Sequence, residues 1–203
     1  PNIDHLAKQG MLFERAYCQQ AVCSPSRLSL ITGRRPDTIK VWDLGTHFRK
    51  ALPTVVTLPQ FFKQNGYHTR SIGKILHGGG SPSKDPISWS VNPVYDNNRD
   101  TEFRYRTERN LRGRGLKRRA SEMAAVEDEA YLDGLICKEA LKVLKSHDKN
   151  SPPFFLAVGF KKPHLPFCAP KKYWDLYDRY SIPLPLSSQH PKNAPELAIR
   201  SWK

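Results

Sequence analysis

The order of apolar and polar positions along the chain alternates between the spacing of helices and the spacing of strands. Residues 3–9 carry a short helical pattern, and a second helix is expected to open near Pro25 and to end at Gly33. Proline suits the first turn of a helix, and glycine suits the residue that ends one. Between these two segments, residues 11–22 are expected to be extended.

The same pattern continues through the rest of the chain. It predicts helices over Leu58–Asn65 and Tyr131–Leu144, and strands over Thr69–Gly73 and Phe154–Val158. The second strand is a continuous apolar run, which is typical of a strand buried on both faces. Strands that alternate with helices predict an α/β fold, in which a sheet is layered with helices.

A region at about 81–120 breaks this alternation, because it has little periodicity and many Pro, Asn, Asp and Arg residues. We expect an irregular insertion there. Its second half is strongly basic, with Arg104, Arg106, Arg109, Arg112, Arg114, Lys117, Arg118 and Arg119. This composition is typical of a segment that binds RNA or another polyanion, and equally of a solvated loop.

Length and charge narrow the class of protein. A chain of 203 residues fits one domain or a large piece of one, and 38% hydrophobic residues indicate a globular protein. We expect no transmembrane segment, because no stretch approaches the roughly 20 apolar residues that span a bilayer. The net charge of +14 implies affinity for nucleic acid, acidic membrane or sulfated polysaccharide. The chain opens on Pro1 without a start methionine, so we expect a fragment.

Cys23 is the candidate for chemistry among four scattered cysteines. It lies at the expected N-terminus of the second helix, where free N–H groups and the positive end of the helix dipole attract negative charge. Arg27, one turn later, can direct its donors to the same place. These features predict a reactive cysteine or an anion pocket, and a buried structural cysteine is the alternative.

The stretch from Cys23 to Gly33 resembles the first signature of the type I sulfatases, C-x-P-S-R followed by an apolar pair, Thr and Gly. The resemblance implies that Cys23 is oxidised to formylglycine by a formylglycine-generating enzyme. That enzyme would read Cys23, Pro25 and Arg27.

Two further motifs carry the same resemblance. The segment 66–77 is similar to the second sulfatase signature and ends in Lys74 and His77, with Leu76 as a mild departure. The segment 159–167, after the second strand, contains Lys162 and His164 and resembles the iduronate-2-sulfatase-like branch. The resemblance implies an alkaline-phosphatase-like sandwich with a mixed or parallel sheet between helices, incomplete in this chain.

The resemblance implies a role for each candidate residue in the hydrolysis of a sulfate ester. Hydrated formylglycine at position 23 would attack sulfur, release the alcohol and then collapse to the aldehyde with loss of sulfate. Arg27 would orient the diol, Lys74 would bind the diol and the sulfate, and His77 would move protons at the diol. His164 is the candidate acid for the leaving oxygen, and it would bind substrate with Lys74 and, more weakly, Lys162.

The resemblance also implies a calcium ion held by oxygen ligands. Cys23, as formylglycine, is the metal ligand expected in this chain, and the remaining ligands are expected before Pro1 and after Lys203. We therefore interpret residues 1–203 as the N-terminal part of a sulfatase catalytic domain, inactive as an isolated fragment.

The expected substrate is a sulfated carbohydrate of glycosaminoglycan type, with 2-O-sulfated uronic acid favoured, in the periplasm, outside the cell or in lysosomes. No nucleic acid partner is expected. Three other interpretations stay open: a phosphate or phosphonate monoester hydrolase of the same superfamily, a degenerate relative that binds polyanions without catalysis, and an RNA-binding protein.

Overall fold

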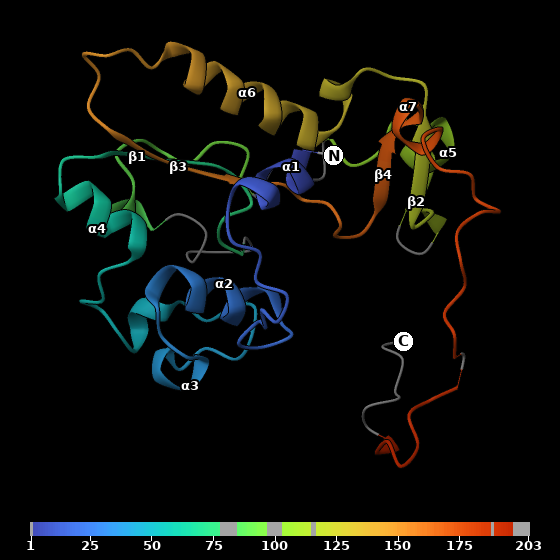
Figure 1. Ribbon diagram of the computed structural model, residues 1–203, viewed down its shortest axis with the longest axis horizontal. Coiled ribbons are helices and arrows are strands. Elements are labelled where there is room, and N and C mark those ends of the chain that lie inside the picture. Colours follow the sequence, from blue (N-terminus) through green and yellow to red (C-terminus); the bar gives the residue numbers. More distant parts are fainter. Residues whose placement is uncertain (1, 78–84, 97–102, 115–116, 188, 197–203) are drawn as a thin grey trace.

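The computed structural model describes the chain over residues 2–77, 85–96, 103–114, 117–187 and 189–196. Within these residues, two separate sheets of two parallel strands are accompanied by helices (Figure 1). The first helix, α1 (Asn2–Gln9), buries none of its residues. No helix in the described part of the chain is both long enough and apolar enough to cross a bilayer.

The first sheet pairs β1 (His68–Gly73) with β3 (Phe154–Gly159) in parallel, so that the two strands end together at Gly73 and Gly159. The helix α6 (Leu132–Ser146) covers this sheet and buries Leu132, Ile136 and Ala140 around Ile72 of β1. Spacing of three to four residues places these side chains on one face of the helix.

The helices that precede β1 form a second apolar cluster. The chain runs through α2 (Cys23–Thr32), α3 (Pro36–Ile39), a 3₁₀ turn at Phe48–Lys50 and α4 (Leu58–Gln64). Gly33 ends α2 in the left-handed conformation, at φ 64°. The cluster joins α2 to the chain after β1 through Leu28, Ile31, Ile39, Val41, Phe48 and Leu76.

The second sheet pairs β2 (Ser121–Ala124) with β4 (Phe167–Pro170), also in parallel. It is accompanied by α5 (Glu108–Arg112) and α7 (Lys171–Trp174), and its small core consists of Tyr105, Ala124, Tyr131 and Cys168. In Figure 1 this unit lies at one side of the molecule, and α2, α3 and α4 lie at the other. Short 3₁₀ turns at Pro86–Ser88 and Asp128–Ala130 complete the elements named here.

Most of the expected elements are confirmed to within two residues, but two expectations about local structure and burial are wrong. Residues 11–22 are not continuously extended, since they contain a turn at 14–15 and bends at 19–22. The strand β3 is not buried: Phe154 is 39% exposed, because among the described strands β3 has a neighbour on one edge only. The apolar run was therefore a correct signal for a strand and a wrong one for its burial.

The basic region is more ordered than its composition suggests. Residues 81–84, 97–102 and 115–116 lie outside the described residues, but residues 103–114 include α5 and bury Tyr105 and Asn110. The alternative of a wholly solvated loop is wrong for this part. Two four-residue strands were not expected from the sequence: β2, which directly follows the basic region, and β4, which lies further along the chain.

Candidate active site

Residues from three distant segments meet where β1 and β3 end. Cys23 is the first residue of α2, Lys74 and His77 follow β1, and Lys161 and His164 follow β3. Because the strands are parallel, their carboxyl ends share one edge, which is where ligands bind in open α/β sheets. The structure therefore brings together the elements that the three sequence motifs occupy.

Arg27 fixes the start of α2 against the end of β1. Its Nε donates a hydrogen bond to Cys23 Sγ at 3.3 Å, and its Nη1 donates to the carbonyl oxygens of Lys74 at 2.6 Å and Ile75 at 3.2 Å. In this unmodified state, the sulfur occupies the place of the oxygens that an oxidised Cys23 would carry. The guanidinium group thus holds a positive charge beside the side chain of Cys23.

Lys74 is buried, with 3% of its surface exposed, and it lies close enough to Cys23 to interact with it electrostatically. Burial lowers the pKa of Lys74 from its ordinary value, the charge of Cys23 opposes that shift, and the charges of Lys161 and Arg27 add to it. Loss of water disfavours a charged ammonium group, so an anion at this place would stabilise it. Lys74 has the position and the environment of an anion-binding residue.

Two glycines allow the strand ends to approach closely enough to build the site. The Lys74 N–H donates to the Gly159 carbonyl at 2.7 Å. A Cβ atom on Gly73 would lie 2.2 Å from Gly159 O, and one on Gly159 would lie 2.2 Å from Lys74 O. Gly73 also has a positive φ of 79°, which favours glycine. The close contact sets the separation of the residues that follow the two strands.

His77 is half-buried, and its Nδ1 atom is buried without a hydrogen-bond partner among the described residues. Burial lowers the pKa of His77 from its ordinary value, and the nearby charges of Lys74, Lys161, Arg27 and His164 lower it further. At neutral pH the imidazole is therefore uncharged and able to accept a proton.

The segment after β3 is held by Asp133 in the first turn of α6. The Asp133 carboxylate accepts the backbone N–H of Lys161 at 2.7 Å and that of Lys162 at 3.0 Å. Nδ1 of the exposed His164 lies 2.8 Å from the Leu165 carbonyl oxygen, which can only accept, so Nδ1 carries a hydrogen. Nε2 of His164 is therefore the nitrogen available to a substrate.

Lys161 is the residue that sequence reasoning missed. It is buried, with 7% of its surface exposed, and its charge acts on both Lys74 and His77. Lys162, the residue named from the motif, lines a different cavity of about 910 Å³ beside α6, together with Cys137 and Tyr173. The sequence contains no direct signal for Lys161, because its place near Lys74 follows from the pairing of β1 with β3, which ends at Gly73 and Gly159.

The described residues do not form a calcium site. They contain no group of three or more His, Cys, Asp or Glu side chains that could hold a metal ion. The charged groups that act on the Cys23 environment are cations, Arg27, Lys74 and Lys161, whereas calcium takes oxygen ligands. The assignment of Cys23 as a metal ligand stays a prediction, and no step of the chemistry below depends on a metal.

Access to Cys23 is through an open cavity of about 860 Å³. The lining includes Cys23, Arg27 and the basic pair Arg34 and Arg35, which follow the end of α2. These exposed guanidinium groups add positive charge at the approach to the cysteine. An anionic ester is therefore the class of ligand that the charges favour.

The chain matches the protein-family model described as Sulfatase over residues 1–189. It is 38% identical over 210 residues to iduronate 2-sulfatase of Mus musculus and 37% identical over 210 residues to that of Homo sapiens. Both alignments cover 100% of this chain. A sulfatase of Formosa agariphila is 31% identical over 203 residues and is matched by 91% of this chain.

A solved structure, BT4656 in complex with its substrate D-glucosamine-2-N,6-O-disulfate, matches 81% of this chain and 29% of that chain, with a TM-score of 0.53 and 20% identity. This likeness shows the fold alone, which is the alkaline-phosphatase-like α/β fold, incomplete here. The chain spans 37% of the mouse protein and 38% of the human protein that it matches.

Proposed function

Since the chain belongs to the sulfatase family, we propose that it forms the nucleophile and anion-binding part of an enzyme that hydrolyses sulfate esters of carbohydrates. The family supports a sulfuric ester hydrolase. The observation that carries the proposal is the hydrogen bond from Arg27 to Cys23, beside the buried Lys74 at the shared end of β1 and β3.

The nucleophile is proposed to be formylglycine made from Cys23, which supplies, when formed, a hydrated aldehyde oxygen for attack on sulfur. Arg27 then orients that oxygen, because its guanidinium group is already bonded to the side chain at position 23 and to the end of β1. Lys74 and Lys161 bind the sulfate oxygens as charge develops on them, which is the main source of rate acceleration in such sites.

The two histidines have different roles in proton transfer, one as the acceptor and the other as the donor. His77, which is uncharged at neutral pH, accepts a proton from the hydroxyl at position 23. His164 gives a proton to the leaving alcohol through Nε2. Because Nδ1 of His164 already carries a hydrogen toward Leu165 O, the acid is the doubly protonated imidazolium.

The proposed substrate is a 2-O-sulfated uronic acid in a glycosaminoglycan-like polymer. The names of the two iduronate 2-sulfatases that this chain matches over its whole length support it. The proposed maturation partner is a formylglycine-generating enzyme, and the proposed compartment is the periplasm, the extracellular space or the lysosome. Calcium binding is proposed to depend on residues outside the described part of the chain.

The test uses the full-length protein expressed together with a formylglycine-generating enzyme. Trypsin releases residues 16–27, which contain both Cys18 and Cys23. Alkylation provides an internal control: a matured protein gives a peptide alkylated at Cys18 alone, with an aldehyde at position 23. We expect this product, together with faster turnover of 4-nitrophenyl sulfate than of 4-nitrophenyl phosphate.

Two results would contradict the proposal. A peptide alkylated at both cysteines, in a protein without turnover, would favour a relative that binds polyanions without catalysis. Faster turnover of the aryl phosphate would favour a phosphate or phosphonate monoester hydrolase. A Cys23→Ala variant controls for contaminating activity, and a Cys18→Ser variant confirms which cysteine is modified.

A further inference from the structure

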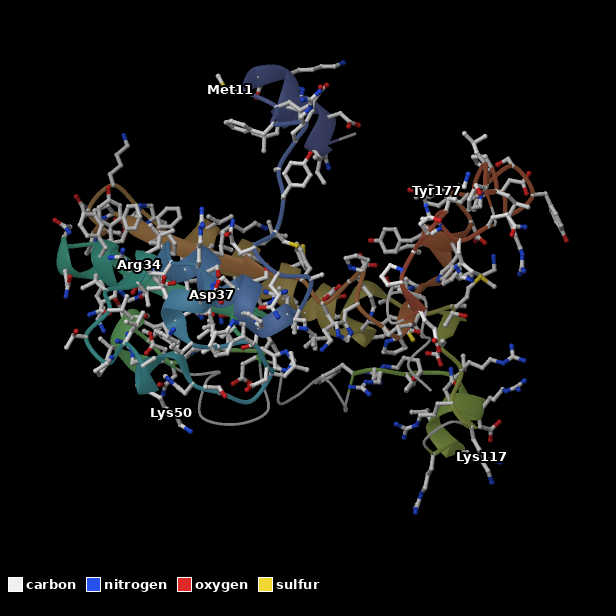
Figure 2. The ribbon with its side chains drawn as sticks, turned by 90° about the horizontal axis from the view of Figure 1, so that it is seen from below. Met11, Arg34, Asp37, Lys50, Lys117 and Tyr177 are labelled. Carbon is white, nitrogen blue, oxygen red and sulfur yellow. The ribbon has the colours of Figure 1, made fainter. Side chains whose placement is uncertain are left out.

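A groove of about 1150 Å³ lies on the β2–β4 unit. Three arginines and three aromatic residues contribute to its lining, namely Arg109, Arg119, Arg179, Tyr173, Trp174 and Tyr177. All six are exposed, with Trp174 at 40% and Tyr177 at 73%. In Figure 2 the labelled residues Tyr177 and Lys117 lie at the opposite end of the molecule from Arg34, which lies near the Cys23 cavity.

The acidic residues of this lining do not neutralise the arginines. The Glu122 carboxylate is buried and accepts hydrogen bonds from Arg106 N at 2.5 Å, Thr107 Oγ1 at 2.6 Å, and Asn110 Nδ2 and Tyr131 Oη, both at 2.7 Å. Asp175 is paired with Lys171 Nζ at 2.6 Å. In the part of the chain that the structure describes, no carboxylate forms an ion pair with Arg109, Arg119 or Arg179.

The lining combines two kinds of contact that an acidic sugar chain needs. Guanidinium groups present several donors in a planar fork that matches carboxylates and tetrahedral oxyanions. Exposed aromatic rings present apolar faces at little entropic cost, suited to the C–H face of a sugar ring. The donors around Glu122 hold α5 and the preceding chain in place, so the side of the groove that carries Arg109 is anchored.

The groove is connected to the catalytic edge by a short stretch of chain. His164 belongs to the proposed active site, and Ala169 of β4 lines the groove. Four residues lie between them, so their Cα atoms are at most about 18 Å apart. A polymer whose reacting sugar lies beside His164 can therefore extend sugar residues that do not react toward the groove.

We propose that this groove binds non-reacting residues of a sulfated polysaccharide while another residue occupies the active site. The proposal rests on the proposed function, because the groove would bind further sugar residues of the same polymeric substrate. Its occupant is an acidic carbohydrate; a single-stranded nucleic acid, which aromatic and arginine side chains also bind, is an alternative that the test separates.

The experiment measures KM and kcat of the full-length matured protein on size-fractionated heparin oligosaccharides, from disaccharide to octasaccharide, and on 4-nitrophenyl sulfate. We expect KM to fall by about tenfold between the disaccharide and the octasaccharide. The double variant Arg109→Gln/Arg179→Gln is expected to lose this gain. Its turnover of the aryl sulfate, which cannot reach the groove, is expected to match the wild type.

The double variant Lys142→Gln/Lys145→Gln is the matched control, because it removes the same charge from exposed positions on α6 outside the groove. The proposal is overturned if KM is independent of length, or if the arginine variant keeps the whole gain. Calorimetry with the octasaccharide measures binding to the groove without any need for turnover. It therefore distinguishes a failure of this proposal from a failure of the proposed function. Displacement of the octasaccharide by oligo(dT) of equal charge would overturn the carbohydrate assignment.

Discussion

At the scale of single residues, the candidate site gathers several cationic side chains close to Cys23. Arg27 contacts the Cys23 sulfur, and Lys74 is buried beside it. Three positive groups that include Lys161 repel one another, and this repulsion lowers the pKa of Lys74. Under the proposed function, a sulfate bound here would relieve this repulsion.

The first prediction concerns Lys161. We expect Lys161→Gln to lower kcat/KM for a sulfate ester by roughly 10–100-fold, because a charge-assisted contact to an anion contributes about 1.5–3 kcal/mol. Lys161→Arg should recover part of the loss. The comparison is Lys162→Gln in the same loop, and a larger loss in that variant than in Lys161→Gln would reverse the assignment of the two lysines.

The second prediction concerns the pH dependence that His77 contributes. Because burial lowers its pKa from the ordinary value of about 6.5, the imidazole stays uncharged below that pH, and the acid limb of kcat/KM is expected there. The unfolded chain binds the proton at the ordinary pKa and the native chain does not. The His77 contribution to stability is therefore complete above about 6.5 and is lost as the pH falls below it.

Urea unfolding of the full-length protein at several values of pH measures this contribution. We expect the decline in the free energy of unfolding between pH 7 and pH 5 to be smaller in His77→Gln than in the wild type. An equal or steeper decline in the variant would show that other groups carry the acid sensitivity.

The residues that sequence alone identified and those that it missed differ in one physical respect. Cys23, Arg27, Lys74 and His77 lie within two contiguous motifs, where fixed spacing already defines the pattern. Lys161 acts on them only because β1 and β3 pair in a particular register, and Asp133 acts only because α6 packs across the sheet. Neither the strand register nor the packing of α6 can be inferred from the residues adjacent to Lys161 and Asp133.

At the scale of elements, the site depends on how closely the two strands of the first sheet approach. The third prediction is that Gly159→Ala destabilises the full-length protein by roughly 1–3 kcal/mol and lowers activity, because the new Cβ would lie 2.2 Å from Lys74 O. Thermal unfolding and aryl sulfate turnover measure the two effects. Gly45→Ala is the control, since its nearest neighbour, Asp43 Oδ1, is 4.0 Å away.

Activity lost without any loss of stability would still place the strand contact in catalysis. An unchanged protein in both measurements would show that the strand ends are not in close contact in solution, contrary to the structure.

Sequence predicted the longer elements and missed the short ones for a physical reason. The helix α6 has 15 residues and one continuous apolar face, so its periodicity is unambiguous. The strands β2 and β4 have four residues each, and the burial pattern of both places two buried side chains on one face. Two alternating buried positions are too few to distinguish a strand from a loop in the sequence. These strands form because of their pairing with distant segments of the chain.

At the scale of the whole molecule, the candidate active site and the groove belong to different sheets. Cys23 of α2 and the residues that follow β1 and β3 lie at the end of the first sheet, whereas the basic and aromatic groove is lined by residues of β2 and β4 and their neighbours. Figure 1 shows the two sheets apart from each other. The sequence showed the excess charge of +14 but could not place it. The structure distributes it over both ends, with Arg34 at the Cys23 cavity and Arg109 at the groove.

The fourth prediction follows from this distribution. For the full-length protein, we expect kcat/KM on a sulfated octasaccharide to fall more than about tenfold between 0.05 and 0.5 M NaCl, because the Debye length shortens from roughly 14 to 4 Å and screens the exposed arginines. On 4-nitrophenyl sulfate the fall should be several times smaller, since Lys74 and Lys161 are buried and buried pairs are screened less. The effect should lie in KM, with kcat unchanged. Equal salt dependence for the polymer and the aryl ester would mean that the salt acts at the catalytic pocket alone, and that the charge of the second sheet does not take part in capturing substrate.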